Sequence, residues 1–384
     1  MFRKMSLFFL MVFIIYGSMH AYVFMRARSV LAFSVTAGIA VAAFMLLMIF
    51  ALFLIRALEQ HEYEFLARML AYLAYFWMAL IFLFFCISLV FDFISLTMRA
   101  AGWLSGIDVQ ASLLSAKISF LLSLILSLSI CIYGYFDAND IRIERVIVET
   151  TKLPAETDKL RIVQISDVHL GLIIRRTRLS KMLDAVKAAK PDILISTGDL
   201  VDAQINHLTG LAELLREVKT KYGNYAITGN HEYYAGLKKA LIFTENAGFT
   251  VLRNRIVNAG PITIVGVDDR TAVQLRLEKP LSEKDFLANI PRDKFILFLK
   301  HQPRIDESTI GLFDLQLSGH THKGQIFPFT WFTQIIFPMI AGTYDLGKGS
   351  ILHISRGTGT WGPPIRFLAP PEVTLIELTR KAER

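Results

Sequence analysis

Five short polar clusters in the second half of this chain carry the residue types that bind divalent metal ions. Each cluster contains histidine, aspartate or asparagine, and each follows a short apolar run. Imidazole nitrogens and carboxylate or amide oxygens are common ligands of metal ions that take part in chemistry. A metal site of this kind can polarise a bound oxygen or activate water. The clusters are "DVH" (167–169), "GDLVD" (198–202), "GNHE" (229–232), His301 and "GHTH" (319–322).

Taken singly, each cluster has an ordinary structural reading. Asp167 and His169 could form a surface pair, Asn230 follows a glycine as in many turns, and His301 could be a partly buried structural histidine. The conjunction of five such clusters after five apolar runs favours a shared metal site instead. The clusters lack thiolates, which argues against a closed structural zinc site and favours Mn²⁺, Fe²⁺ or catalytic Zn²⁺. The ligands suffice for two ions that share one carboxylate.

The apolar runs before the clusters predict the strands of an α/β fold. Short apolar segments alternate with segments of helical spacing, which is typical of α/β domains. Such sheets bind ligands beyond the carboxyl ends of their strands, so the five clusters could converge there. On extended backbone, Asp167 and His169 would face the same side because they are two residues apart. Strands crowd together in the last third of the chain and predict a second sheet packed against the first. The predicted strands are 160–166, 191–197, 225–228, 261–267, 294–300, 313–319, 350–355 and 372–378, and the predicted helices are 178–190, 207–220 and 236–248.

The order and content of the five clusters resemble the calcineurin-like metallophosphoesterase superfamily over about residues 160–379. Segments around the clusters, among them "SDVHLG", "THKGQ" and "PIRFLAPPEVTLIEL", are similar to a bacterial branch with membrane-attached members. That branch includes a hydrolase of UDP-diacylglucosamine, and eukaryotic transmembrane proteins with a metallophosphoesterase domain look similar as well. The resemblance implies a two-sheet α/β sandwich and a hydrolase of phosphoric esters or pyrophosphates that uses two divalent metal ions.

The resemblance also implies roles for individual residues. It implies a hydroxide held between two metal ions as the nucleophile, and His231 as the catalytic residue that serves the departing oxygen. Asp202 and Glu232 would support the site without binding metal. The implied metal ligands are Asp167, His169 and His322 for one ion, Asn230, His301 and His320 for the second, and Asp199 between them.

The first 137 residues differ from the rest of the chain in charge. They hold only 14 of the 74 Asp, Glu, Lys and Arg residues. Four apolar runs there are each near or above the roughly 20 residues that cross a bilayer as helix. The runs cover about residues 6–25, 30–55, 70–96 and 113–136. We therefore expect a four-helix transmembrane region (1–136), a linker (137–159) and a metallophosphoesterase domain (160–384).

Basic residues beside the predicted spans favour a cytoplasmic catalytic domain. Four spans place both ends of the chain on one side, and that side carries twice as many of these cations as the other, which favours the cytoplasm. The expected location is a bacterial inner membrane. The cations on the two sides are Arg3, Lys4, Arg56, Arg68, Arg142 and Arg145 against Arg26, Arg28 and Arg99.

The net charge of +8 bears on the partners of the chain. In a membrane protein this charge favours attraction to anionic lipid headgroups. The sequence has no motif typical of nucleic-acid binding, so no nucleic-acid partner is expected. Cys86 and Cys131 both fall in apolar runs and predict neither a zinc cluster nor a disulfide framework. The oligomeric state stays open.

Two features bear on the substrate. Arg175, Arg176 and Arg178 follow the first cluster and could clamp a phosphate or diphosphate, although a solvated basic turn accounts for them as well. Residues 327–342, "FPFTWFTQIIFPMIAG", are apolar and aromatic but too short for a further span. They could be core or could dip into the bilayer beside the site.

Together with the membrane region, these features favour a lipid or a lipid-linked nucleotide such as UDP-diacylglucosamine as substrate. An alternative is a tethered phosphodiesterase or phosphatase of soluble or cell-wall phosphoesters. A sensor that has lost activity would show broken clusters, and a transporter would show charges near the middle of its spans. The sequence shows neither feature.

Overall fold

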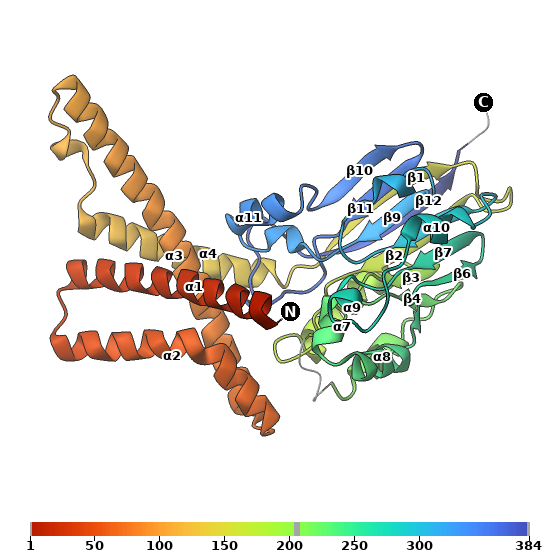
Figure 1. Cartoon of the computed structure of the whole chain (residues 1–384), viewed down its shortest axis with the longest axis horizontal. Helices are drawn as coiled ribbons and strands as arrows, with labels where there is room; N and C mark the ends of the chain where they lie inside the picture. Colours follow the sequence, from red (N-terminus) through yellow and green to blue (C-terminus); the bar gives the residue numbers. More distant parts are fainter. Residues whose placement is uncertain (1, 203–207, 382–384) are drawn as a thin grey trace. The chain divides into compact units, whose positions relative to one another are not determined.

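A computed structural model describes residues 2–202 and 208–381, without the side chains of residues 2–10 and 12. The chain forms two compact units (Figure 1), and each has its own apolar core. The first unit comprises residues 1–135 with 362–365, and the second comprises 136–361 with 366–384. Two parts of the predictions lie outside the described residues. They are residue 207, where the predicted helix 207–220 begins, and the last three residues of the predicted domain.

The first unit consists of long apolar helices. Among the described residues, three segments are long and apolar enough to cross a membrane, namely Val35–Gln60, Glu64–Ser105 and Gln110–Asp137. They correspond to the second, third and fourth predicted spans. The first predicted span is helical within α1, but a fourth span is not confirmed. The elements are α1 (Phe2–Leu31), α2 (Val35–Gln60), α3 (Glu64–Ser105), the short η1 (Gln110–Ser112) and α4 (Ala116–Asp137).

Helix α3 is much longer than the predicted span at 70–96. It runs for 42 residues because no proline interrupts it. It stops where Gly106 adopts a left-handed conformation, a common way to end a helix. The apolar composition predicted only the middle of this helix. Its ends lie outside the apolar run, and the C-terminal end is set by the backbone conformation of Gly106.

The second unit contains two six-stranded sheets on either side of one apolar core, as the sequence predicted. The first sheet has the order β1-β12-β2-β3-β4-β5 and the second β10-β11-β9-β8-β7-β6. The first is built from β1 (Arg142–Thr150), β12 (Glu372–Arg380), β2 (Lys159–Ile165), β3 (Ile193–Ser196), β4 (Asn224–Ala226) and β5 (Thr250–Val251). The second is built from β10 (Gly342–Gly347), β11 (Ser350–Ile354), β9 (Leu315–Ser318), β8 (Phe295–Leu299), β7 (Ile262–Gly266) and β6 (Arg255–Ala259).

Apolar side chains from the facing sides of both sheets form the core. Ile162 and Ile195 of the first sheet belong to the same buried cluster as Ile264, Leu297 and Leu317 of the second. Strands β3 and β8 are buried along their whole length. Strands covered on both faces are expected to be continuously apolar, which is why these two were easy to recognise in the sequence.

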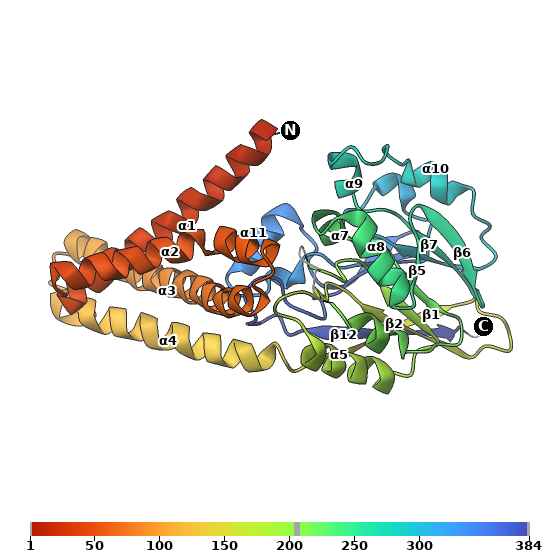
Figure 2. The same cartoon turned by 90° about the horizontal axis from the view of Figure 1, so that it is seen from below.

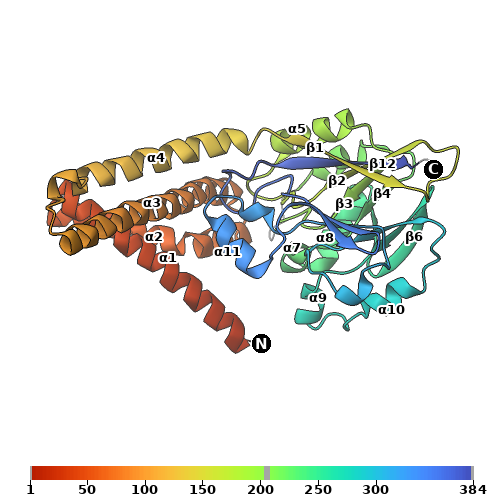
Figure 3. The same cartoon turned by 90° about the horizontal axis from the view of Figure 1, so that it is seen from above.

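Helices cover the outer faces of the two sheets. Figures 2 and 3 show α5 (Arg176–Ala188) and α10 (Glu283–Ala288) on opposite sides of the sheet pair. Helix α5 buries Met182 and Val186, and α10 packs Leu287 in a cluster with Phe298. The remaining elements are α6 (Leu211–Arg216), α7 (Asn230–Tyr234), α8 (Leu237–Asn246), α9 (Thr271–Gln274), η2 (Glu307–Thr309), η3 (His322–Gly324) and α11 (Phe329–Ile336).

Parallel pairing places the five polar clusters. Strands β2, β3 and β4 run parallel in the first sheet, and β7, β8 and β9 run parallel in the second. The clusters follow β2, β3, β4, β8 and β9 directly. Their loops therefore leave the carboxyl ends of the strands, where α/β sheets carry their ligand sites.

The segment expected to be a linker contains a strand. Residues 137–159 include β1, which pairs in parallel with β12 from Arg142↔Glu372 to Thr150↔Arg380. Alternating charged residues made "RIERVIVET" resemble a polar connection, but an edge strand tolerates such residues because one side of it stays in water. The division of the chain at residues 136 and 160 stays a prediction.

Candidate metal centre

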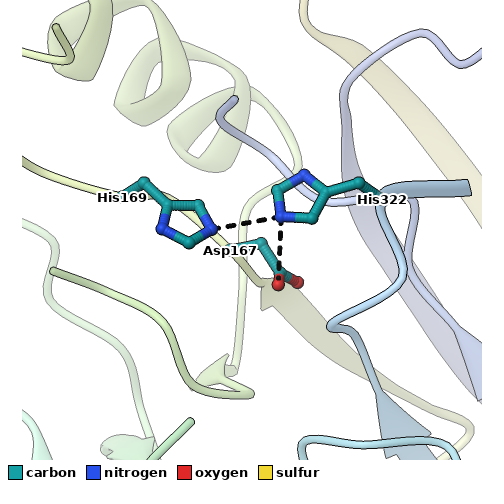
Figure 4. A group of neighbouring side chains, drawn as sticks. All are labelled: Asp167, His169 and His322. Carbon is teal, nitrogen blue, oxygen red and sulfur yellow. Dashed lines mark hydrogen bonds and ion pairs between the residues drawn. The ribbon is translucent and has the colours of Figure 1, made fainter. Parts of the chain in front are cut away.

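The first group of converging side chains joins the two sheets. Asp167 and His169 follow β2, and His322 follows β9 more than 150 positions later. Figure 4 shows the three side chains pointing toward one another. The His169 Nε2 and His322 Nε2 atoms lie 3.1 Å apart, and His322 Nε2 lies 3.4 Å from Asp167 Oδ1. Three ligand-type atoms thus face one small volume.

A second group lies around His301. Its Nε2 atom is 3.2 Å from Asp199 Oδ2, 3.2 Å from Asn230 Oδ1 and 3.2 Å from His320 Nδ1. The four residues come from the loops after β3, β4, β8 and β9. The structure thereby brings together the second set of ligands implied by the resemblance.

Asp199 lies between the two groups. Its Oδ1 accepts a hydrogen bond from the backbone N–H of His231 at 2.8 Å. Its Oδ2 faces His301 Nε2 at 3.2 Å and His169 Nε2 at 3.9 Å. One carboxylate oxygen therefore lies close to a histidine of each group, as a carboxylate shared by two ions must.

The backbone around these residues is unusual. Five of the seven predicted ligands have positive φ, namely Asp167, His169, Asp199, His320 and His322. Residues other than glycine rarely adopt this conformation, and its cost is often accepted at functional sites. The expectation of extended backbone at Asp167 and His169 was therefore wrong, because both have φ of 53° and turn out of the strand.

Close packing of the loops also requires glycine at one ligand loop. A Cβ atom on Gly319 would overlap Ser166 Oγ and Asp167 Oδ2. The absence of a side chain at Gly319 lets the His320 backbone N–H reach both carboxylate oxygens of Asp167, each at 3.0 Å. This contact holds the loop after β9 against the loop after β2.

Burial keeps three of the predicted histidine ligands neutral, while carboxylates decide the charge of a fourth. It lowers the pKa of His169 to about 4 and that of His320 to about 3, and burial together with Arg366 holds the pKa of His322 well below its usual range. These imidazoles are neutral at pH 7 and keep lone pairs for a metal ion. Burial alone would also lower the pKa of His301, but the carboxylates of Asp199, Asp167 and Asp269 together outweigh it and raise that pKa well above its usual value.

These observations fit divalent metal ions at both groups. The donors are imidazole nitrogens and carboxylate or amide oxygens without thiolate, a set suited to Mn²⁺, Fe²⁺ or Zn²⁺. The raised pKa of His301 shows that the buried carboxylates attract a positive charge into this volume. In the described part of the chain, His169 Nδ1 is buried without a hydrogen-bond partner.

Two carboxylates outside the ligand set hold the loops in place. Glu232 accepts hydrogen bonds from the backbone N–H groups of Gly229, Asp199 and Leu200, and so joins the loops after β3 and β4. Asp202 Oδ1 lies 2.9 Å from Nδ1 of His231. Burial would lower the pKa of His231, but Asp199 and Asp202 outweigh it and raise that pKa to about 9.

Sequence reasoning missed Arg366, which contacts a predicted ligand. Arg366 is fully buried, and its Nη2 atom lies 3.2 Å from His322 Nδ1. The same guanidinium donates to the backbone carbonyls of Arg356, Gly359 and Ala369. A single arginine within the apolar stretch "PPIRFLAPP" was the available signal, because a buried arginine needs acceptors that the structure must supply.

The three arginines predicted to bind substrate lie at the start of helix α5. Arg178 donates to the Thr360 hydroxyl at 3.1 Å and to the Ala138 carbonyl at 2.9 Å, two groups outside the predicted ligand set. Arg176 is exposed, and Arg175 is half-buried. A role of these residues in substrate binding stays a prediction.

Comparisons with known proteins agree with this geometry. The family model for calcineurin-like phosphoesterases matches residues 160–324. An uncharacterized metallophosphoesterase of Aquifex aeolicus is 39% identical over 252 residues, which cover 65% of this chain and 96% of the relative. A transmembrane protein with metallophosphoesterase domain from Danio rerio is 31% identical over 67% of this chain and 62% of its own length. An uncharacterized metallophosphoesterase of Bacillus subtilis is 32% identical over 64% of this chain and 89% of its own length. The chain belongs to the calcineurin-like phosphoesterase family of metal-dependent hydrolases.

Proposed function

We propose that this metallophosphoesterase is a membrane-anchored phosphohydrolase with two metal ions. It cleaves a phosphoester or pyrophosphate bond, and its substrate is a lipid or a lipid-linked nucleotide such as UDP-diacylglucosamine. The observation that carries the catalytic part is the position of Asp199 Oδ2, within 3.9 Å of a histidine nitrogen in each of two ligand groups.

The residues that would hold the ions divide between the two groups. Asp167, His169 and His322 would hold one ion, and Asn230, His301 and His320 would hold the second. Asp199 would contribute to both. Two bound divalent cations supply positive charge for phosphate oxygens and lower the pKa of water, so that a nucleophile exists at neutral pH.

His231 is the residue proposed to serve the leaving group. Its ring lies against that of His169, with 4.5 Å between centroids, while its Nδ1 faces Asp202. Burial would lower the pKa of this imidazole, but the nearby carboxylates outweigh burial, and Asp202, which is not a proposed ligand, favours the protonated form. A protonated imidazole can donate a hydrogen bond or a proton to an oxygen that gains negative charge as it departs.

The lipid part of the proposal rests on the apolar helices of the first unit. Three helices have the length and composition of membrane spans, which would keep the enzyme at a bilayer. We further propose four spans in a bacterial inner membrane, with the phosphoesterase domain in the cytoplasm, from the distribution of basic residues.

A hydrolysis screen tests the proposal. Full-length enzyme loaded with Mn²⁺ would be assayed on UDP-diacylglucosamine, on phospholipids and on a generic aryl phosphodiester, with metal content measured in parallel. Turnover of a lipid substrate is expected. Turnover of the aryl diester alone would contradict the lipid substrate and favour a tethered enzyme for soluble or cell-wall phosphoesters. Absence of any turnover at a metal content of about two ions per chain would contradict the hydrolase itself.

A further inference from the structure

Helix α11 exposes an unusually apolar surface. Its side chains Phe329, Trp331, Phe332, Ile335 and Ile336 are each between 47% and 80% exposed. Of its eight residues, Thr333 alone is buried. A helix with one small inward residue and five large exposed apolar residues gains little from the protein core and exposes much apolar area to its surroundings.

This helix is attached at both ends to the loop that carries His320 and His322. Near its start, the Thr330 hydroxyl donates to the Lys323 carbonyl at 3.1 Å. Just past its end, the Phe337 ring lies against the His320 ring, with 5.2 Å between centroids. The Thr321 hydroxyl donates to the carbonyl of Ile340 at 2.5 Å. Anything that binds α11 is therefore close to two predicted metal ligands.

Two further exposed apolar residues lie outside the helix. Leu368 is 57% exposed, and its neighbour Phe367 exchanges backbone hydrogen bonds with Gln325 and Phe327, just before α11. Trp361 is 54% exposed, and its ring centroid lies 6.1 Å from that of His231. We name α11, Trp361 and Leu368 the apolar rim.

The surroundings favour a lipid bilayer as the partner of this rim. Tryptophan and phenylalanine are typical of surfaces that enter the interface between headgroups and acyl chains. A cation lies beside the end of α11, since the guanidinium of Arg304 lies 4.7 Å from the ring centroid of Phe337, the residue that follows the helix. Basic residues next to apolar ones match an anionic membrane surface. The spans of the same chain supply such a surface.

We propose that the apolar rim inserts into the bilayer interface and opens the metal centre toward amphiphilic phosphoesters, so that the phosphate reaches the site while the acyl chains stay in the lipid. The membrane contact stands on the rim itself. The selection of amphiphilic substrates rests on the proposed function, and the rim is the feature that would produce this selection.

Fluorescence of Trp331 tests the membrane contact without any assay of activity. In the full chain, Trp77, Trp103 and Trp361 would be replaced by Phe, which leaves Trp331 as the single tryptophan. The protein would be placed in vesicles of phosphatidylcholine and phosphatidylglycerol with brominated or ordinary acyl chains. Bromine should quench Trp331 at least about twofold, since an interfacial helix lies within reach of the upper acyl chain.

A matched control places the single tryptophan elsewhere on the same unit. Ile242 of α8 is 48% exposed, and the variant Ile242→Trp with Trp331→Phe reports on a face outside the rim. Circular dichroism and gel filtration would confirm that both proteins are folded. Quenching of Trp331 no greater than that of the control overturns the membrane contact, including the case in which a second copy or another protein covers α11.

A pair of substrates tests the selection. p-Nitrophenyl hexadecyl phosphate dispersed in the same vesicles and water-soluble p-nitrophenyl methyl phosphate share one leaving group. The variant Ile335→Asp/Ile336→Asp should lose about tenfold or more in kcat/KM for the tailed ester and nothing for the methyl ester, because its chemistry is intact. Ile242→Asp should change neither value.

The outcomes separate the two proposals. Equal loss on both esters would overturn the selection of amphiphiles by the rim. If wild-type enzyme hydrolyses neither ester and no substrate of the screen above, the proposed function fails, while the quenching of Trp331 still decides whether the rim meets the bilayer.

Discussion

The Nδ1 atom of His231 lies 2.9 Å from Oδ1 of Asp202, two residues that come from the loops after two neighbouring parallel strands. Since an ionised carboxylate only accepts, Nδ1 carries a proton and the other ring nitrogen is the one available to a substrate. Asp202 therefore orients His231 and helps to keep it protonated.

The variant Asp202→Asn should retain its metal ions but turn over more slowly. The amide keeps the size of the side chain and loses the charge that helps to raise the pKa of His231. We expect kcat on an aryl phosphodiester to fall by about ten- to hundredfold, the usual effect of removing a partner that orients a working side chain. Loss of metal together with activity would show instead that Asp202 supports the ligands.

The variant His231→Asn tests the proposed proton donor itself. His231 is not among the proposed ligands, so metal content should stay unchanged. Turnover should fall by about a hundredfold or more, because general acid catalysis contributes about that much. The effect should be smaller for a substrate whose leaving group needs no proton. Equal turnover of variant and wild type at identical metal loading would rule out this role.

The variant Asp199→Asn should lose metal. Its carboxylate lies close to His301 and His169, one from each ligand group, so a neutral amide weakens both sites. Elemental analysis after dialysis should find fewer ions per chain than in the wild type. An unchanged metal content would show that Asp199 does not serve two ions.

Removal of metal should destabilise the wild-type enzyme. A ligand that binds only the folded state stabilises it by about 2.7 kcal/mol at a free concentration of a hundred times Kd. Thermal unfolding in EDTA should therefore occur at a lower temperature, and Mn²⁺ should restore the original value. Asp199→Asn serves as the control, since its unfolding should respond much less to either treatment.

The variant Arg366→Met should weaken metal binding although Arg366 is not itself a proposed ligand. Arg366 joins His322 to the carbonyls of the segment from Arg356 to Ala369, and its loss leaves buried carbonyls without donors. We expect about ten- to hundredfold weaker metal affinity, the range seen when a partner of a ligand is removed. Calorimetric titration with Mn²⁺ measures this change.

Arg178→Met is the matched control for that experiment. Arg178 also bonds a backbone carbonyl, that of Ala138, but this bond and the one to Thr360 lead to residues outside the ligand set. Its metal affinity should be that of the wild type. A similar loss of affinity in both variants would show that general destabilisation, and not the contact with His322, accounts for the effect of Arg366→Met.

Residue type and strand periodicity alone located most of the candidate centre. A histidine or carboxylate directly after a continuously apolar strand indicates a shared ligand site when five such places occur in one domain, because parallel strands deliver their carboxyl ends to one edge. The length of the apolar runs predicted the three candidate spans after residue 30, because a helix needs about 20 apolar residues to cross a bilayer.

The tertiary structure decided those features that depend on contacts between residues far apart in the sequence. Arg366 is recognisable as a support of His322 only when both are seen, because the acceptors that let an arginine be buried come from several loops. Strand β1 pairs with β12 across some 230 positions, so its local sequence could not reveal it. The left-handed backbone of Asp167 and His169 is imposed by the packing of loops from both sheets, and α11 became a surface because neighbouring segments leave its apolar side chains uncovered. The sequence alone thus predicted which residues could bind metal. The burial of Arg366, the left-handed backbone of the ligands and the exposure of α11 arise from contacts that only the folded chain makes.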